Sequence, residues 1–202
     1  MPKRHPIRAE NLRRALAQEA ARVMAEHGVR DFLVAKRKAA ERFGVGDGAM
    51  LPKNTEIEAA LAEYQRLFRG DSHVASLHAQ RRAALQAMRK LSDFEPRLVG
   101  PVLAGTATEH SDIELHLFAD SPESVAFSLM DQGIRHEITA RRVKMNADRV
   151  LECPGVRFLI NDQAVAATVF PTDGIRQAPV SPVDGRPMRR ADVAELEALL
   201  EG

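Results

Sequence analysis

Apolar side chains recur three or four residues apart through most of the first half of the chain, which places them on one face of a helix. Thr55 and Glu58 fit a capping box, in which the Thr and Glu side chains satisfy each other's free backbone donors at a helix start. Four helices are therefore predicted, at about 12–24, 31–43, 55–68 and 71–91.

At Leu98 the apolar pattern changes from a period of 3.6 to alternation, which is typical of strands. A helix is expected after Ser121 and Pro122, and another near the carboxyl end. The predicted strands lie at about 98–103, 113–118, 134–143, 156–160 and 165–170. We expect an α+β protein, with a helical region at 1–95 packed on a small mixed sheet within 96–202.

Two acidic residues stand out on the second predicted strand. Asp112 and Glu114 are two positions apart, so both carboxylates leave the same face, with their Cα atoms about 6.6 Å apart. Two acids at this spacing repel each other unless a cation lies between them. We expect them to bind Mg²⁺ or Mn²⁺ together with the phosphate oxygens of a substrate.

A glycine-threonine turn precedes this strand. Gly105 lets the backbone pass close to a triphosphate, and the Thr106 hydroxyl and nearby amides can donate to phosphate oxygens. We expect the turn to bind the phosphates of a nucleoside triphosphate.

The arrangement of Gly105-Thr106 followed by Ser111-Asp112-Ile113-Glu114 resembles the nucleotidyltransferase superfamily, over roughly residues 99–171. Helical residues before it and the ending at 176–187 resemble an uncharacterised bacterial group of such proteins. The resemblance implies a sheet of nucleotidyltransferase type and Mg²⁺-dependent transfer of a nucleoside monophosphate from a nucleoside triphosphate to an unknown acceptor. It also implies catalytic, metal-binding roles for Asp112 and Glu114, and nucleotide binding at Gly105 and Thr106.

The chain departs from the superfamily pattern at Ala166. The superfamily places a third carboxylate on a later strand, and the matching stretch here is Val165-Ala166-Ala167. Glu137 or Glu152 is the substitute that a neighbouring strand offers. The alternative to an enzyme is a non-catalytic module of the same fold that binds nucleotide, nucleic acid or protein.

Three further groups bear on the site. His110 and His116 flank the acidic pair. His110 is a candidate for phosphate contact, and His116 is either a third group facing the metal ion or a residue with only a structural role in the strand. We also expect residues 171–190 to pack across the sheet and bring Arg176 or Arg186 toward the phosphate turn, because a planar guanidinium suits bidentate phosphate contact.

The net charge of +1 conceals an asymmetry. Residues 1–98 carry 19 Lys and Arg against 12 Asp and Glu, whereas residues 99–202 carry 10 against 16. The resulting charges, +7 and −6, suit a basic helical region that contacts nucleic acid, or a well-solvated helical surface. Only 4% of residues are aromatic, which argues against base stacking on single strands.

The remaining features concern location. Cys153 is the single cysteine, so it forms no internal disulfide and favours a reducing compartment. The amino terminus leads into a charged helix, and no run of eighteen apolar residues occurs. We expect a cytoplasmic protein without a secretory leader or a membrane partner.

Overall fold

The computed structural model describes residues 4–46 and 50–201, so the first three residues of the amino-terminal segment lie outside the described residues. The chain forms two compact units. Of the described residues, the first contains 4–46, 50–74, 108–110 and 182–184, and the second contains 75–107, 111–181 and 185–201. The observed class is α+β, with helices preceding a five-stranded mixed sheet, as predicted.

The first unit is built from α1 (Arg4–His27), α2 (Phe32–Arg42) and α3 (Asn54–Phe68). Asp31 caps α2 by accepting a hydrogen bond from the Val34 amide at 2.9 Å. One apolar cluster joins the three helices, and it is formed by Leu16, Ala17, Ala20, Ala21, Met24, Ala25, Ala35, Ala39, Ile57 and Leu61. Its many alanines let the helix backbones approach closely.

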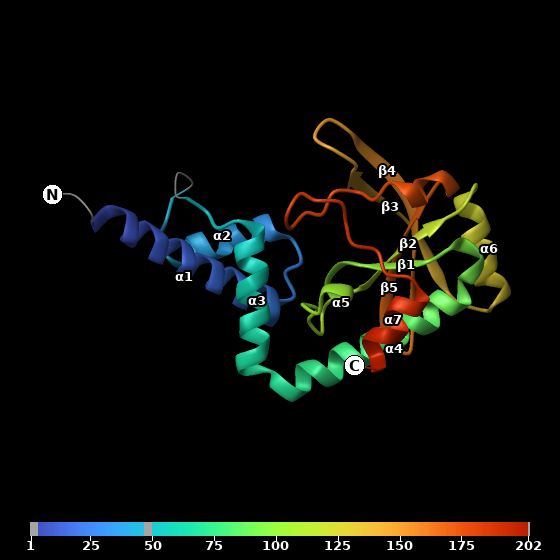
Figure 1. The fold of residues 1–202 in the computed structure, drawn as a ribbon, viewed down its shortest axis with the longest axis horizontal. Helices are drawn as coiled ribbons and strands as arrows, with labels where there is room; N and C mark the ends of the chain where they lie inside the picture. Colours follow the sequence, from blue (N-terminus) through green and yellow to red (C-terminus); the bar gives the residue numbers. More distant parts are fainter. Residues whose placement is uncertain (1–3, 47–49, 202) are drawn as a thin grey trace. The chain divides into compact units, whose positions relative to one another are not determined.

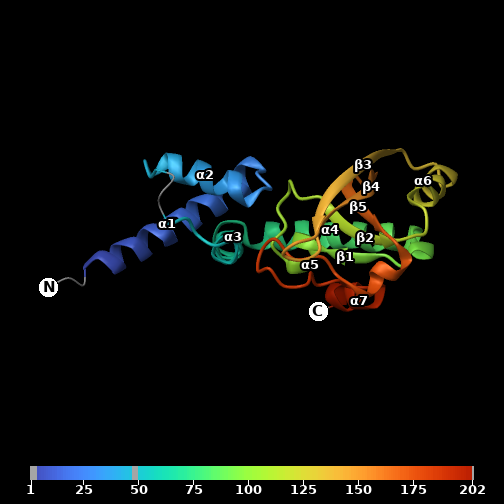
Figure 2. The same ribbon diagram turned by 90° about the horizontal axis from the view of Figure 1, so that it is seen from above.

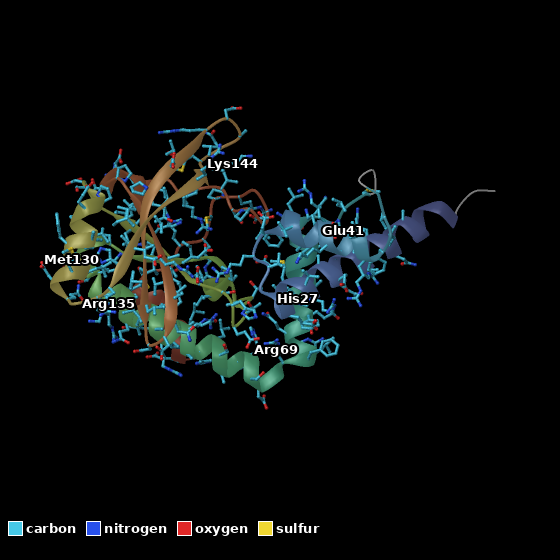
Figure 3. The ribbon with its side chains drawn as sticks, turned by 180° about the vertical axis from the view of Figure 1, so that it is seen from behind. His27, Glu41, Arg69, Met130, Arg135 and Lys144 are labelled. Carbon is cyan, nitrogen blue, oxygen red and sulfur yellow. The ribbon has the colours of Figure 1, made fainter. Side chains whose placement is uncertain are left out.

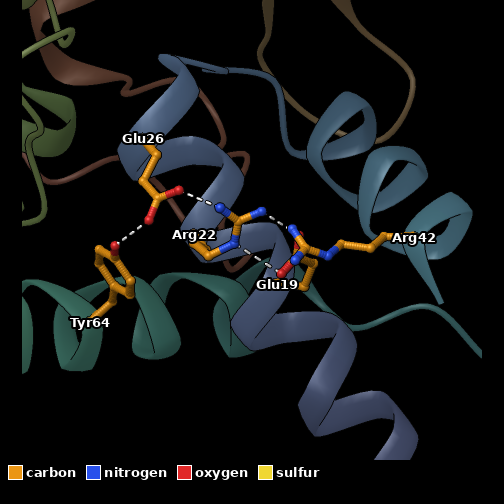
Figure 4. Close-up of polar contacts among 5 residues, drawn as sticks. All are labelled: Glu19, Arg22, Glu26, Arg42 and Tyr64. Atoms are coloured by element: carbon orange, nitrogen blue, oxygen red, sulfur yellow. Dashed lines mark hydrogen bonds and ion pairs between the residues drawn. The ribbon is translucent and has the colours of Figure 1, made fainter.

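A polar network also connects the three helices (Figure 4). Arg22 donates to Glu19 at 2.8 Å and to Glu26, both on α1, while Arg42 of α2 donates to Glu19 at 3.1 Å. Tyr64 of α3 donates its hydroxyl to the second oxygen of Glu26 at 2.6 Å. The pKa of Glu26 is lowered, chiefly by the Tyr64 hydroxyl, and the pKa of Glu19 is lowered, chiefly by Arg22.

The start of α3 differs from the prediction. The helix begins at Asn54, and Glu56, not Glu58, accepts a hydrogen bond from the Lys53 amide at 2.7 Å. The predicted pairing of Thr55 with Glu58 is therefore wrong. The physical role is the same, because an acidic side chain in the first turn still satisfies a free backbone donor.

The second unit contains the sheet, whose strand order is β1-β2-β5-β4-β3. The labels follow this order from bottom to top in Figure 2. The pairs β1–β2, β5–β4 and β4–β3 are antiparallel, and β2–β5 is parallel. The strands are β1 (Arg97–Val99), β2 (Ile113–Phe118), β3 (His136–Lys144), β4 (Val150–Ile160) and β5 (Gln163–Phe170).

One face of the sheet is apolar. Helices α4 (Gly70–Lys90), α6 (Pro122–Asp131) and α7 (Val193–Glu201) contribute residues to the cluster that covers it, and α7 lies beside α4 in Figure 1. The strands contribute Ile113, Leu115, Leu117, Val156, Phe158, Ile160, Val165, Ala167 and Val169 to that cluster. Because side chains alternate along a strand, Glu114, His116 and Phe118 leave the opposite face. We call this second face the polar face.

The predicted strand at 98–103 ends early. Only Arg97–Val99 pair with β2, and the next residues form the short helix α5 (Gly100–Ala104). Gly100 has φ of +70°, and Pro101 follows it at the first turn. These two residues turn the chain, because glycine adopts the left-handed region readily and proline fits a helix start.

The ends of β3 and β4 form a two-stranded extension, visible in Figure 1. Residues 140–144 pair with 150–154, whereas β5 pairs only with residues 155–160 of β4. Figure 3 labels Lys144, the last residue of β3, and Arg135, just before its start. Among the described residues, no helix has the length and apolar character needed to cross a membrane.

Candidate functional site on the polar face

A row of residues crosses the polar face where the acidic pair was predicted. Glu114 of β2, Ala166 of β5, Arg157 of β4 and Glu137 of β3 occupy matching positions in the strand register. Adjacent strands lie about 4.8 Å apart, so Ala166 directly neighbours both Glu114 and Arg157. The row places a small side chain between a carboxylate and a guanidinium.

Asp112 lies just before β2 and contacts Arg157. A terminal nitrogen of Arg157 lies 3.2 Å from Asp112 Oδ1. The Asp112 side chain is largely buried, while 47% of the Arg157 side chain remains exposed. Because Ala166 has no long side chain, the row leaves room for Arg157 to extend toward β2.

Glu114 contacts a second arginine. A terminal nitrogen of Arg141, on β3, lies 3.4 Å from Glu114 Oε1, and 54% of the Arg141 side chain is exposed. The other Glu114 oxygen lies against Gly100: a Cβ at that position would stand 2.9 Å from Glu114 Oε2. Gly100 therefore both turns the chain into α5 and makes space for the carboxylate.

The two carboxylates share a face, as predicted, but each has an arginine beside it. Among the described residues, no group of three or more His, Cys, Asp or Glu side chains could hold a metal ion. A divalent ion would have to replace both arginines, so this donor set, as arranged, does not fit a two-ion centre. The Mg²⁺ or Mn²⁺ expectation stays a prediction.

Glu137 and Glu152, the two candidates for the third carboxylate, lie on β3 and β4, and neither strand is next to β2. Glu137 shares the polar face and is three strands from Glu114 in the strand order, on the same strand as Arg141, which does contact Glu114. Glu152 is four residues from Val156 on β4, so it shares the apolar-face side of that strand. That either one completes the acidic pair stays a prediction.

The phosphate turn follows α5. Gly105 ends that helix with φ of +84°, and the amides of Gly105 and Thr106 both donate to the Pro101 carbonyl, at 2.8 and 3.0 Å. These two amides are thus committed to the helix end, as in other left-handed helix caps. Phosphate binding at Gly105 and Thr106 stays a prediction. In this geometry the Thr106 hydroxyl, and not these two amides, would donate to the phosphate.

His116 lies in the row next to Glu114 and is only 5% exposed. Its Nδ1 accepts a hydrogen bond from Arg190 Nε at 3.1 Å, and its ring meets the edge of Phe170 with centroids 4.8 Å apart. Burial first, then the charges of Arg190 and Arg141, lower the His116 pKa to about 3. His116 is therefore neutral and serves as a buried contact for Arg190.

The segment after β5 supplies Arg190 to the polar face, and the approach of Arg176 or Arg186 to the phosphate turn stays a prediction. Arg190 also donates to the carbonyls of Gly174 and Ile175, each at 3.1 Å, whereas Arg176 and Arg186 are exposed. His110 belongs to the first unit, where Arg30 donates to its carbonyl. Sequence periodicity offers no signal for the pairing of Arg190 with His116, because 74 residues separate them.

A basic cavity of about 460 Å³ lies along α4, among the residues Arg82, Leu85, Gln86, Arg89 and Lys90. Arg89 pairs with Glu197 of α7 at 2.6 Å. Arg82 and Lys90 add two further positive charges to the lining of the cavity. Because α4 packs on the apolar face of the sheet, this cavity is separate from the polar-face site.

We compared the chain with known proteins. No protein-family model, curated protein sequence or solved structure matches it. The resemblance to nucleotidyltransferases therefore stays a prediction that rests on the sequence from Gly105 to Glu114.

Proposed function

We propose that the polar face binds the phosphate groups of a nucleoside triphosphate without transferring the nucleotide. The observation that carries the proposal is the pairing of both predicted metal ligands with arginines, Asp112 with Arg157 and Glu114 with Arg141. The arginines then supply the positive charge that metal ions supply in a transferase.

The chemistry of the arginines supports this function. A guanidinium carries five N–H donors, and each ion pair engages one terminal nitrogen, so both Arg141 and Arg157 keep donors for phosphate oxygens. Both side chains are about half exposed and so are accessible to a ligand. The carboxylates of Asp112 and Glu114 hold the two guanidinium groups in place.

The same geometry disfavours catalysis. Transfer by two metal ions requires carboxylates that are free to hold both ions and to accept a proton from the attacking hydroxyl. Asp112 and Glu114 are engaged by arginines, and Ala166 has no carboxylate. The alternative, Mg²⁺-dependent nucleotidyl transfer to an unknown acceptor, is supported by the sequence resemblance and requires both arginines to leave.

Calorimetric titration of ATP, first with EDTA and then with Mg²⁺, tests the proposal. We expect binding in EDTA that Arg157→Gln weakens by about 10- to 100-fold, the usual effect of losing a charged hydrogen bond. Arg142→Gln is the matched control, because Arg142 is exposed on the opposite face of β3. Binding that requires Mg²⁺ and is tightened by Arg157→Gln, together with transfer of labelled nucleotide, would instead establish the enzyme.

A further inference from the structure

Arg190 is a partly buried cation whose partners do not neutralise it. Its Nε donates to His116, and one terminal nitrogen donates to two backbone carbonyls, those of Gly174 and Ile175. All of these acceptors are uncharged. The other terminal nitrogen, Nη2, is buried and has no hydrogen-bond partner.

The surroundings of Arg190 make this arrangement costly. The guanidinium carbon lies 5.0 Å from the centroid of the Phe118 ring and 5.5 Å from that of Phe170. These contacts stabilise a cation modestly, but they do not provide a hydrogen-bond acceptor for Nη2. A buried donor without an acceptor loses its hydration without compensation.

A second arginine lies on the same side of the sheet, where its guanidinium donates to the carbonyls of Glu95 and Pro96. Arg97 of β1 pairs with His116 of β2 in the antiparallel register, so the two are direct neighbours. The pKa of Arg190 is lowered to about 10, first by burial and then by the charge of Arg97. The carboxylate that contacts Arg97, Glu95, lies 3.3 Å from it and is mostly exposed. Two guanidinium groups therefore repel each other beside a neutral histidine.

We infer that Arg190 and Arg97, with His116 between them, form a binding site for a phosphate group. A phosphate that enters beside Arg97 would offset the charges of both arginines, and by displacing the groups that cover Arg190 Nη2 it would accept hydrogen bonds from that nitrogen. The Arg97 side chain is 22% exposed, so this corner of the polar face is open to solvent on that side. The site lies one row beyond Glu114, about 6.6 Å along β2.

The site is independent of the proposed function. A single phosphate group is sufficient to occupy it, whereas nucleotide binding rests on Arg157 and Arg141. Free phosphate and a phosphate group of a larger ligand share the required chemistry, and inorganic phosphate and ATP distinguish these two sources.

Thermal unfolding of the full chain with increasing inorganic phosphate tests the inference, with chloride at the same ionic strength as the reference. We expect a saturable rise in the melting temperature, since a ligand that binds only the folded state stabilises it. Arg97→Met should weaken phosphate binding by at least about 10-fold while leaving the Arg190 contacts with Gly174 and Ile175 in place. Arg190→Met should act in the same way.

Arg189→Met is the matched control, because Arg189 is the exposed neighbour of Arg190 and loses the same charge. It should retain the full phosphate effect. The inference is overturned if the native protein shows no saturable phosphate effect, or if Arg97→Met and Arg190→Met respond like Arg189→Met. The two proposals can fail separately. If Arg157→Gln still binds inorganic phosphate but the native protein binds no ATP in EDTA, the phosphate site is supported and the proposed function is rejected.

Discussion

Ala166 of β5 lies directly beside Glu114 of β2 in the parallel register, and Arg157 of β4 lies on its other side. The position at which the nucleotidyltransferase pattern expects a third acid is thus next to an arginine that already contacts Asp112. This relationship determines how the site should respond to a restored carboxylate.

Restoring the acid with Ala166→Glu should create a metal site. The new carboxylate can pair with Arg157 and release Asp112, and it adds a ligand beside Glu114. We expect Mn²⁺ binding, measured by titration, to tighten by about 10-fold or more, as one added ligand contact of roughly 1.4 kcal/mol would produce.

Ala164→Glu is the control for that change, because residue 164 lies on the same face of β5 and is also partly buried. It should leave Mn²⁺ affinity unchanged. Equal affinities in native protein and Ala166→Glu would show that Ala166 is not the missing ligand position.

Gly100→Ala should destabilise the protein more than Gly133→Ala. The two glycines have φ of +70° and +69°, so each substitution incurs the same left-handed strain, about 1–2 kcal/mol. Only at Gly100 does the new Cβ meet Glu114 Oε2, whereas nothing lies within 4 Å at Gly133. In urea denaturation, Gly100→Ala should lower the free energy of unfolding by about 1 kcal/mol or more beyond the loss in Gly133→Ala. Equal losses would mean that Glu114 moves aside freely.

Acid should weaken the network in the first unit. The pKa values of Glu19 and Glu26 are lowered from 4.5, so their contribution is complete above about pH 4.5 and is lost as the pH falls through the lowered values. We expect the melting temperature of the native chain to fall in this range. Glu26→Gln should have a flatter pH profile, and Glu63→Gln, on the exposed side of α3, should follow the native profile.

Nucleic-acid binding, if it occurs through the basic half, should depend on α4. Several other arginines are paired with acids, as Arg42 is with Glu19, but Arg82 and Lys90 line the cavity on α4. For an RNA probe, log affinity falls as log salt rises. In the double variant Arg82→Ala/Lys90→Ala this fall should be less steep, with the magnitude of the slope reduced by about two. Arg42→Ala is the control. An unchanged slope in the double variant would assign the contact elsewhere.

The local elements follow from the sequence, because helix periodicity, caps and strand alternation depend on residues close together in the chain. Asp31 caps α2, β2 occupies Ile113–Phe118 as predicted, and Glu114 faces away from Ile113 because successive strand residues alternate. The prediction was wrong at Gly100, where a backbone turn ended the strand despite an apolar run that continues through Leu103.

Only the tertiary structure decided what surrounds the acidic pair. The arginines that contact Asp112 and Glu114 are 45 and 27 residues away, and their positions depend on how β4 aligns with β5 and β3 with β4. Strand register is set by packing across the whole sheet, and a shift of one residue would turn Arg157 to the opposite face. The residue types for a phosphate or metal site are thus readable in the sequence, whereas the partner of each charge is a property of the assembled sheet.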